Sequence, residues 1–242
     1  MEIKPRINSL AKPLQGLGAL LHLFYPRLCE GCRKPLLPAE QVLCLSCAME
    51  LPETGFAQTE GNEAELRFAG RVPFEHATSL AYFTTDGLLQ HLLHGLKYKG
   101  RKEIGVYLGR KLGATLLASG WGSAVDVIIP VPLHKAKRAE RGYNQSLLIA
   151  AGIGEILGIP VTDDQLMRVR KTETQTNKSR ADRVKNMEEA FRVKNKGSLS
   201  GKHILLCDDV LTTGATLESC ALASLKEENV KISFATIGIA VS

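Results

Sequence analysis

The sequence predicts an α/β fold in which a parallel-rich sheet is flanked by helices and preceded by a small cysteine-rich module. Short apolar runs at residues 125–131 and 204–207 are typical of parallel strands that are buried on both faces. Apolar residues at helical spacing follow both runs, at residues 147–157 and 216–225. Paired cysteines near the N-terminus indicate a separate metal-binding module before the sheet.

The composition is that of an ordinary globular protein. Its 242 residues are 44% hydrophobic and 23% charged. A chain of this length can bury a sizeable core, either as one large domain or as a domain with a small appendage. Lys and Arg exceed Asp and Glu by 31 to 25, which suits anionic ligands but does not by itself indicate nucleic-acid binding.

Residues 1–25 predict a short amphipathic segment that packs on the rest of the chain. Its apolar part, residues 14–25, is too short to cross a bilayer and contains Gln15 and His22. A secretory signal is the alternative, but no small-residue cleavage site follows. We therefore expect no membrane span and a cytoplasmic protein.

Two cysteine pairs, Cys29-x-x-Cys32 and Cys44-x-x-Cys47, predict a zinc ribbon over residues 26–52. Each pair places two thiolates on one tight turn, and two such turns can complete a tetrahedron around Zn²⁺. Two disulfides are the alternative, which is less consistent with a chain that lacks an export signal. The zinc is expected to be structural, because so short a segment cannot build a core of its own.

Residues 53–75 predict a solvated linker, since acidic residues and glycines are frequent there. A larger domain, residues 76–242, then opens with a strand-like stretch at 77–83. The pattern from 88 to 117 is mainly helical. Glycines recur there at every fourth position, 105, 109 and 113, and predict close contact with a neighbouring helix rather than a membrane motif.

Two basic segments frame the strand predicted at 125–131. The first surrounds Tyr98. The second follows Pro130 and Pro132, which end the strand, and leads through a loop into the helix predicted at 147–157. A solvated basic surface is the ordinary interpretation, and contact with phosphate or DNA is the functional one. The candidate contacts are Lys97, Lys99, Arg101, Lys135, Arg138 and Arg141. A third basic segment covers residues 168–196.

The most informative stretch runs from His203 to Thr216. Its apolar run leads to two adjacent carboxylates, Asp208 and Asp209, and a helical pattern begins at Thr216. The hydroxyls, glycine and amides between them would form an anion-binding loop at a helix N-terminus. The carboxylates would repel a bare phosphate but accept hydrogen bonds from hydroxyls. A sugar phosphate satisfies both features, whereas a strand-to-helix turn with a Thr cap is the alternative.

All thirteen residues from 204 to 216 resemble the fingerprint of the type I phosphoribosyltransferases. The resemblance implies a parallel-rich sheet of that fold and a site for phosphoribosyl pyrophosphate (PRPP), accompanied by Mg²⁺. Asp208 and Asp209 would hold the ribose hydroxyls. The residues that would hold the 5-phosphate are Thr212, Thr213, Gly214, Ala215 and Thr216. The loop that would grip the pyrophosphate contains Val131, Pro132 and Leu133. The scheme requires no general base, and we assign no catalytic residue.

The order of motifs along the chain resembles the ComF family of phosphoribosyltransferase-like proteins. The shared motifs are the paired cysteines, Leu96-Lys97-Tyr98, the stretches 130–133, 141–145 and 175–191, and the fingerprint. The resemblance implies a zinc ribbon joined to a phosphoribosyltransferase-like domain, and a link to uptake of transforming DNA. PRPP, single-stranded DNA, and a competence helicase or other DNA-uptake protein are the implied partners.

Two functions remain open from the sequence. The first is an enzyme that transfers a phosphoribosyl group from PRPP to an unidentified acceptor. The second is a non-enzymatic competence factor that senses PRPP and binds single-stranded DNA through its basic segments. A pocket for an acceptor base would favour the enzyme, and the sequence contains no recognisable pattern for one.

Overall fold

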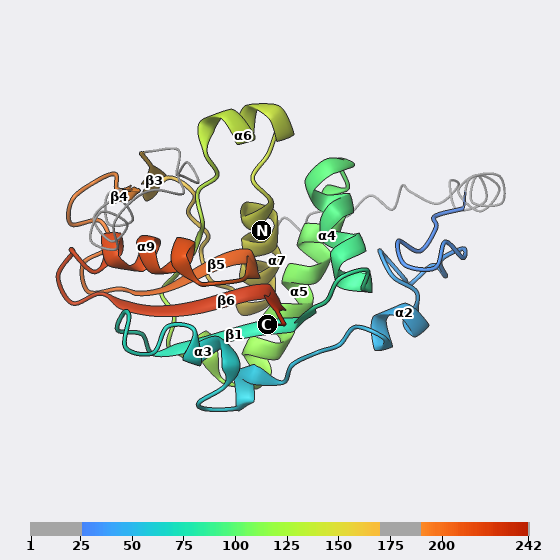
Figure 1. The fold of residues 1–242 in the computed structure, drawn as a ribbon, viewed down its shortest axis with the longest axis horizontal. Helices are drawn as coiled ribbons and strands as arrows, with labels where there is room; N and C mark the ends of the chain where they lie inside the picture. The colour runs from blue at the N-terminus through green and yellow to red at the C-terminus, as the bar shows by residue number, and fades with distance from the viewer. Residues whose placement is uncertain (1–25, 170–189, 242) are drawn as a thin grey trace, which may run out of the picture. The chain divides into compact units, whose positions relative to one another are not determined.

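The computed structural model describes residues 26–169 and 190–241 of the chain (Figure 1). The chain divides into two compact units, one ending at Ala48 and the other beginning at Met49. The amphipathic segment expected at 1–25 lies outside the described residues, as do residues 170–189 of the third basic segment. Within the part that is described, no helix has the length and apolar character that a membrane crossing requires.

Four parallel strands form the main sheet of the second unit, in the order β1-β6-β5-β2. They span His76–Phe83 (β1), Val127–Pro130 (β2), His203–Leu211 (β5) and Lys231–Ala240 (β6). The predicted α/β class with a parallel sheet is therefore confirmed. Because all four strands run in one direction, their carboxyl ends meet at one edge and their amino ends at the other (Figure 1).

Helices cover both faces of this sheet. One face carries α4 (Leu88–Tyr98), α5 (Lys102–Ala118) and α7 (Gln145–Leu157). The other carries α9 (Ala215–Ser224) and α3 (Glu63–Leu66). Residues 203–207 of β5 are all buried, as expected for a central strand with both faces covered.

The remaining elements are short. They are α2 (Leu45–Met49), the 3₁₀ helices η1 (Phe56–Gln58) and η2 (Trp121–Ser123), α6 (Lys135–Arg141), and the antiparallel strands β3 (Leu166–Arg168) and β4 (Phe191–Val193). Residues 135–141, expected to be loop, thus form a helix. His134 caps its start by accepting a hydrogen bond from the Ala136 amide, and Gly142, at φ 78°, ends it.

Residues 53–75 belong to the core rather than to a solvated linker. Phe68 is fully buried and its ring stacks on that of Phe234 in β6, with centroids 4.0 Å apart. Asn62 caps α3 and donates a hydrogen bond to the carbonyl oxygen of Ala77, which ties the segment to β1. The many acidic residues of this segment made it resemble a solvated linker, although its apolar side chains pack on the core. The prediction of a linker over residues 53–75 is therefore corrected.

The glycines of α5 allow it to lie directly against α7, as their spacing predicted. A Cβ atom added to Gly109 would overlap the carbonyl oxygen of Ile149, and one added to Gly152 would overlap that of Val106. The two backbones therefore touch where other helix pairs would have side chains between them.

Replacing Gly109 by Ala is expected to lower the free energy of unfolding by about 2 kcal/mol, because the added methyl group must push the two helices apart. Gly122 is the matched control. A Cβ atom there would meet Leu157 at an ordinary 3.5 Å, so Gly122→Ala is expected to change stability by less than about 0.5 kcal/mol. Urea unfolding of both variants measures the difference, and equal effects would contradict the close contact.

Candidate functional site at the carboxyl edge of the sheet

The predicted strand, loop and helix are present, with β5 longer than its apolar run. The strand continues to Leu211, because β6 pairs alongside it and places Asp208 opposite Thr236. Residues 212–214 form the turn, and α9 begins at Ala215. Gly214 has a φ of 79°, a left-handed conformation that other residues rarely adopt. The turn therefore brings the two acids and the start of α9 to the same edge.

The turn surrounds a small cavity of about 40 Å³, lined by Asp208 and residues 210–217. Arg71 stabilises the turn from outside the cavity. Its guanidinium donates a hydrogen bond to the carbonyl oxygen of Thr213 at 2.7 Å and pairs with Glu218 in α9. Arg71 was not among the predicted site residues, because it lies in the stretch taken for a linker. Its contacts hold the loop in place without the arginine entering the cavity lining.

The two acids have different surroundings. Asp208 accepts hydrogen bonds from the Ser146 hydroxyl, at 2.7 Å, and from the Asp209 amide, at 2.9 Å. Asp209 is only 6% exposed, and its Oδ2 atom lies 2.8 Å from the Lys97 ammonium group. The contact between Lys97 and Asp209 Oδ2 does not have hydrogen-bond geometry, so we describe it as an ion pair.

Burial is the main cause that raises the pKa of Asp208 to about 7, and the charge of Asp209 adds to it. Part of Asp208 still reaches solvent, but protein atoms surround its carboxyl group. The hydrogen bonds from Ser146 and the Asp209 amide, and the charge of Lys97, act in the opposite direction. The pair therefore carries its full charge only above about pH 7.

The loop after β2 lies beside this acid pair. β2 pairs with β5, with Pro130 opposite Cys207, and the amide of Val131 donates to the Cys207 carbonyl oxygen at 2.9 Å. Asn144, which caps α7, donates to the carbonyl oxygen of Val131 and accepts from the Ser146 amide. These contacts fix Val131, and with it the start of the loop 131–133, beside Asp208 in β5.

A second cavity, of about 320 Å³, adjoins the acids through Lys97 and is rich in cations and tyrosines. Its lining residues are Lys97, Tyr98, Gly100, Lys137, Glu140, Arg141 and Tyr143. The Arg141 guanidinium lies over the Tyr98 ring, 5.7 Å from its centroid. We call this the basic cavity.

The structure brings only some of the predicted basic residues together. Lys97 and Arg141 line the basic cavity, and so does Lys137, which was not among the predicted contacts. The other four, Lys99, Arg101, Lys135 and Arg138, do not line it. Arg138 pairs with Asp163 at 3.6 Å, and Arg101 with Glu103 at the same distance. Tertiary packing, not spacing along the chain, decides which cations converge.

The first unit holds the four predicted zinc ligands together. The sulfur atoms of Cys29, Cys32, Cys44 and Cys47 all lie within 4.8 Å of one another, and those of Cys32 and Cys44 are 3.7 Å apart. Zn–S bonds of about 2.3 Å in a tetrahedron place sulfurs about 3.8 Å apart, so the cluster fits Zn²⁺. Among the residues described, no other group of three or more His, Cys, Asp or Glu ligands converges in this way.

The thiol environments favour at least one thiolate. Burial opposes ionisation of Cys29, but the amides of Cys44 and Gly31 donate to its sulfur at 3.3 Å and 3.4 Å, and its pKa falls to about 7. Burial and the neighbouring thiols raise the pKa of Cys47. Once one sulfur is ionised, ionisation of its neighbours needs a cation among them.

The sequence matches the family model of the phosphoribosyl transferase domain over residues 144–242. It is 36% identical over 218 residues to Competence protein F of Haemophilus influenzae, covering 88% of this chain and 91% of that protein. It is 30% identical over 215 residues to DNA utilization protein YhgH of Salmonella typhimurium, covering 84% of this chain and 93% of that protein. Competence protein ComFC of Bacillus subtilis is 28% identical over 202 residues, covering 83% and 79%.

Proposed function

Because the chain belongs to the ComF family of phosphoribosyltransferase-like proteins, we propose that it binds PRPP at the carboxyl edge of its sheet and transfers the phosphoribosyl group to an acceptor. One observation carries the proposal. Two adjacent acids, Asp208 and Asp209, lie in β5 shortly before a glycine turn that leads into a helix, in a phosphoribosyl transferase domain. This combination suits a sugar phosphate.

In the proposed complex the ribose hydroxyls donate hydrogen bonds to Asp208 and Asp209. The 5-phosphate occupies the small cavity of the turn, against the hydroxyls and amides of residues 212–216. Lys97 must then exchange part of its contact with Asp209 for the ligand. Its position in the basic cavity lets it turn toward the pyrophosphate, together with Arg141 and the loop 131–133.

The proposed reaction breaks the bond between C1 of the ribose and the pyrophosphate oxygen. The electron pair leaves on pyrophosphate, a lone pair of the acceptor forms the new bond at C1, and the acceptor loses its proton to water. Lys97 and Arg141 would offset the charge that develops on the leaving group. Holding both reactants in line supplies the remainder of the rate enhancement.

Ser146 donates to Oδ1 of Asp208 and Lys97 pairs with Oδ2 of Asp209, so one oxygen of each carboxylate is already engaged within the protein. Carboxylate oxygens are ligands that Mg²⁺ prefers, so the acid pair would suit an Mg²⁺ ion that binds together with PRPP. When bound, such an ion shares the charge of the pyrophosphate.

The transferase is tested by incubating the chain with PRPP, Mg²⁺ and a panel of nucleobases and amines, and measuring pyrophosphate release. We expect release that depends on one class of acceptor. An Asp208→Asn, Asp209→Asn double variant should lose it, whereas Asp164→Asn, an exposed acid elsewhere on the surface, should retain it. PRPP binding without release for any acceptor would favour the non-enzymatic alternative.

The second candidate function is a PRPP-sensing factor that binds single-stranded DNA, and the basic cavity is the observation that favours it. Its cations surround the two tyrosines Tyr98 and Tyr143, an arrangement that suits a phosphate backbone with stacked bases. Tyr98 is 69% exposed and therefore accessible to a base. The names of the relatives, DNA utilization protein and Competence protein, support a role in DNA use or competence, and the partner proposed for it is a competence helicase or other DNA-uptake protein.

Salt dependence tests the DNA proposal. A groove that neutralises about four phosphates is expected to lose affinity for oligonucleotides with a log–log slope of roughly −3. Changing Lys97, Lys137 and Arg141 to Ala should flatten that slope, whereas Lys135→Ala, outside the cavity, should not. Anisotropy of a labelled oligonucleotide series across a salt titration measures both. Absence of binding at low salt, or an unchanged slope in the triple variant, would exclude the basic cavity as the DNA site.

A further inference from the structure

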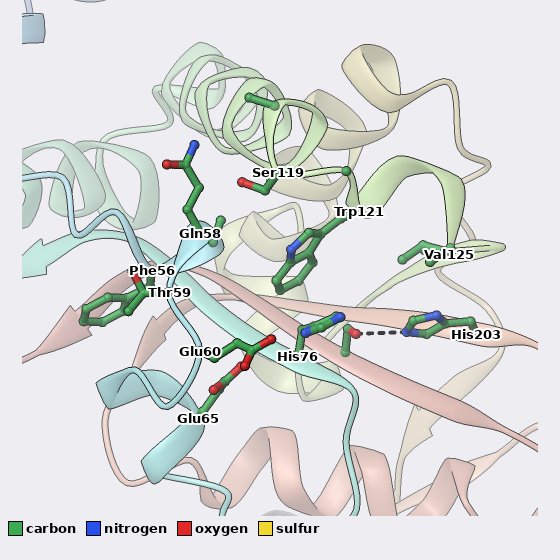
Figure 2. Close-up of a pocket in the computed structure, with 15 residues that line it drawn as sticks. Phe56, Gln58, Thr59, Glu60, Glu65, His76, Ser119, Trp121, Val125 and His203 are labelled. Atoms are coloured by element: carbon green, nitrogen blue, oxygen red, sulfur yellow. Dashed lines mark hydrogen bonds between the residues drawn. The ribbon is translucent and has the colours of Figure 1, made fainter.

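A cavity of about 420 Å³ lies at the amino edge of the sheet, opposite the candidate PRPP site (Figure 2). Its lining includes His76 and His203, the first residues of β1 and β5, and Ser233 near the start of β6. His203 and Asp208 are five residues apart on one strand, so about 17 Å separates this cavity from the acid pair. We call it the amino-edge cavity. It shares no lining residue with either cavity at the carboxyl edge.

One wall of the amino-edge cavity is aromatic. The Trp121 indole and the His76 imidazole lie with centroids 5.1 Å apart, and Figure 2 shows both rings in the middle of the cavity. Trp121 is only 7% exposed and is therefore fixed in its position. The His76 imidazole is exposed and is supported by this fixed indole, so it presents an aromatic face on which a planar group can stack.

The opposite wall is acidic. The carboxylates of Glu60 and Glu65 extend toward the His76 ring in Figure 2, and the described residues that line the cavity include no lysine or arginine. Glu65 Oε2 accepts a hydrogen bond from the Gly61 amide at 2.6 Å, which leaves its other oxygen for a ligand. This wall favours N–H donors and disfavours phosphate.

The inner end holds a buried imidazole. His203 is 8% exposed and its Nε2 atom shares a hydrogen bond with the Ser233 hydroxyl at 2.9 Å. Burial is the main cause that lowers the pKa of His203, which favours the neutral form of the ring. The described residues around the cavity include no converging group of three metal ligands, so a preformed metal site is not present there.

We propose that the amino-edge cavity binds a planar heteroaromatic amine without phosphate, such as an aminated nucleobase. The flat ring lies against His76, which Trp121 supports from behind, and the amine donates to Glu60 and Glu65. A volume of 420 Å³ accommodates one such molecule and falls within the range of small-ligand sites. The inference concerns a different edge of the sheet and does not depend on the proposed transferase.

Trp121 provides a direct probe, because it is the only tryptophan of the chain. Titration of the full-length protein with adenine or cytosine is expected to change its fluorescence saturably, with a dissociation constant between about 10 μM and 1 mM. Hypoxanthine and uracil, which lack the exocyclic amine, and AMP, which adds a phosphate, are expected to bind at least about tenfold more weakly.

Two variants separate the acidic wall from general charge effects. Glu60→Gln with Glu65→Gln should weaken adenine binding about tenfold, since amides keep the shape but lose the charge. Glu63→Gln, on the same helix α3 as Glu65 but outside the cavity lining, should leave it unchanged. Glu60 and Glu63 are exposed, and an amide oxygen at position 65 can still accept the hydrogen bond from Gly61, so both proteins should fold normally.

Four results would overturn the proposal. The first is the absence of a saturable fluorescence change with either amine-bearing base up to about 10 mM. The second is equal affinity for AMP and adenine, and the third is an unchanged affinity in the double glutamine variant. Displacement of adenine by PRPP would also contradict it, because it would place the base at the carboxyl edge instead.

Discussion

Removal of zinc is expected to unfold residues 26–48 while the parallel sheet remains folded. The apolar interior of this unit is small, and two of its buried residues, Cys29 and Cys47, are themselves proposed ligands. Binding of a structural Zn²⁺ ion contributes about 10–16 kcal/mol to the folding of such modules. The sheet lies in a separate compact unit with its own core, so it should not need the metal.

Metal analysis and hydrogen exchange measure this prediction. Protein purified without chelator should contain about one equivalent of zinc. The Cys44→Ser variant should contain no zinc, and the backbone amides of residues 26–48 should lose their protection from hydrogen exchange. Cys220→Ala removes a cysteine that lies buried in α9 and should retain the metal. Less than about half an equivalent in the wild-type protein, or two disulfides detected by mass, would contradict the zinc site.

The double change Asp208→Asn, Asp209→Asn is expected to weaken PRPP binding by about 10-fold to 100-fold, because one or two charge-assisted hydrogen bonds to the ribose are lost. The fold should persist, since asparagine keeps the shape of both side chains and the Ser146 hydroxyl can still donate to residue 208. Equilibrium dialysis with labelled PRPP measures the loss, with Asp164→Asn as the control that should bind normally.

The same acid pair predicts the pH dependence of PRPP binding. The pKa of Asp208 is raised to about 7, so the folded chain keeps this proton up to neutral pH. A protonated carboxyl accepts ribose hydrogen bonds poorly, and binding should therefore weaken as the pH falls below 7. Asp209→Asn removes a neighbouring negative charge and should shift this transition to lower pH. A transition that stays at the same pH in that variant would contradict the assignment.

The sequence predicted those helices, strands and ligand sets whose pattern lies within a short stretch of the chain. The apolar run before Asp208 identified β5, and the glycine turn identified the start of α9 to within one residue. It did not predict that β5 extends to Leu211, because that extension depends on pairing with Ile239 in β6, a partner distant in sequence. The cysteine pairs identified their cluster correctly, since the ligand set is encoded in two short motifs.

Contacts between distant segments were not predictable in this way. The ion pair between Lys97 and Asp209 joins the end of α4 to β5, and no spacing rule connects them. Phe68 was missed because the acidic residues and glycines of the stretch 53–75 indicated a linker, yet it stacks on Phe234 in the core. The amino-edge cavity likewise assembles residues from five separate stretches of the chain. Such features follow from tertiary packing rather than from periodicity.

Calorimetric titration of the wild-type chain with PRPP and Mg²⁺ tests the central claim most directly. The turn and the acid pair together predict one PRPP bound per chain, and displacement by ribose 5-phosphate, which carries the groups that these residues are proposed to hold. Adenine should not displace it. No measurable binding, or binding that ribose 5-phosphate leaves unchanged, would contradict a phosphoribosyl site at the end of β5.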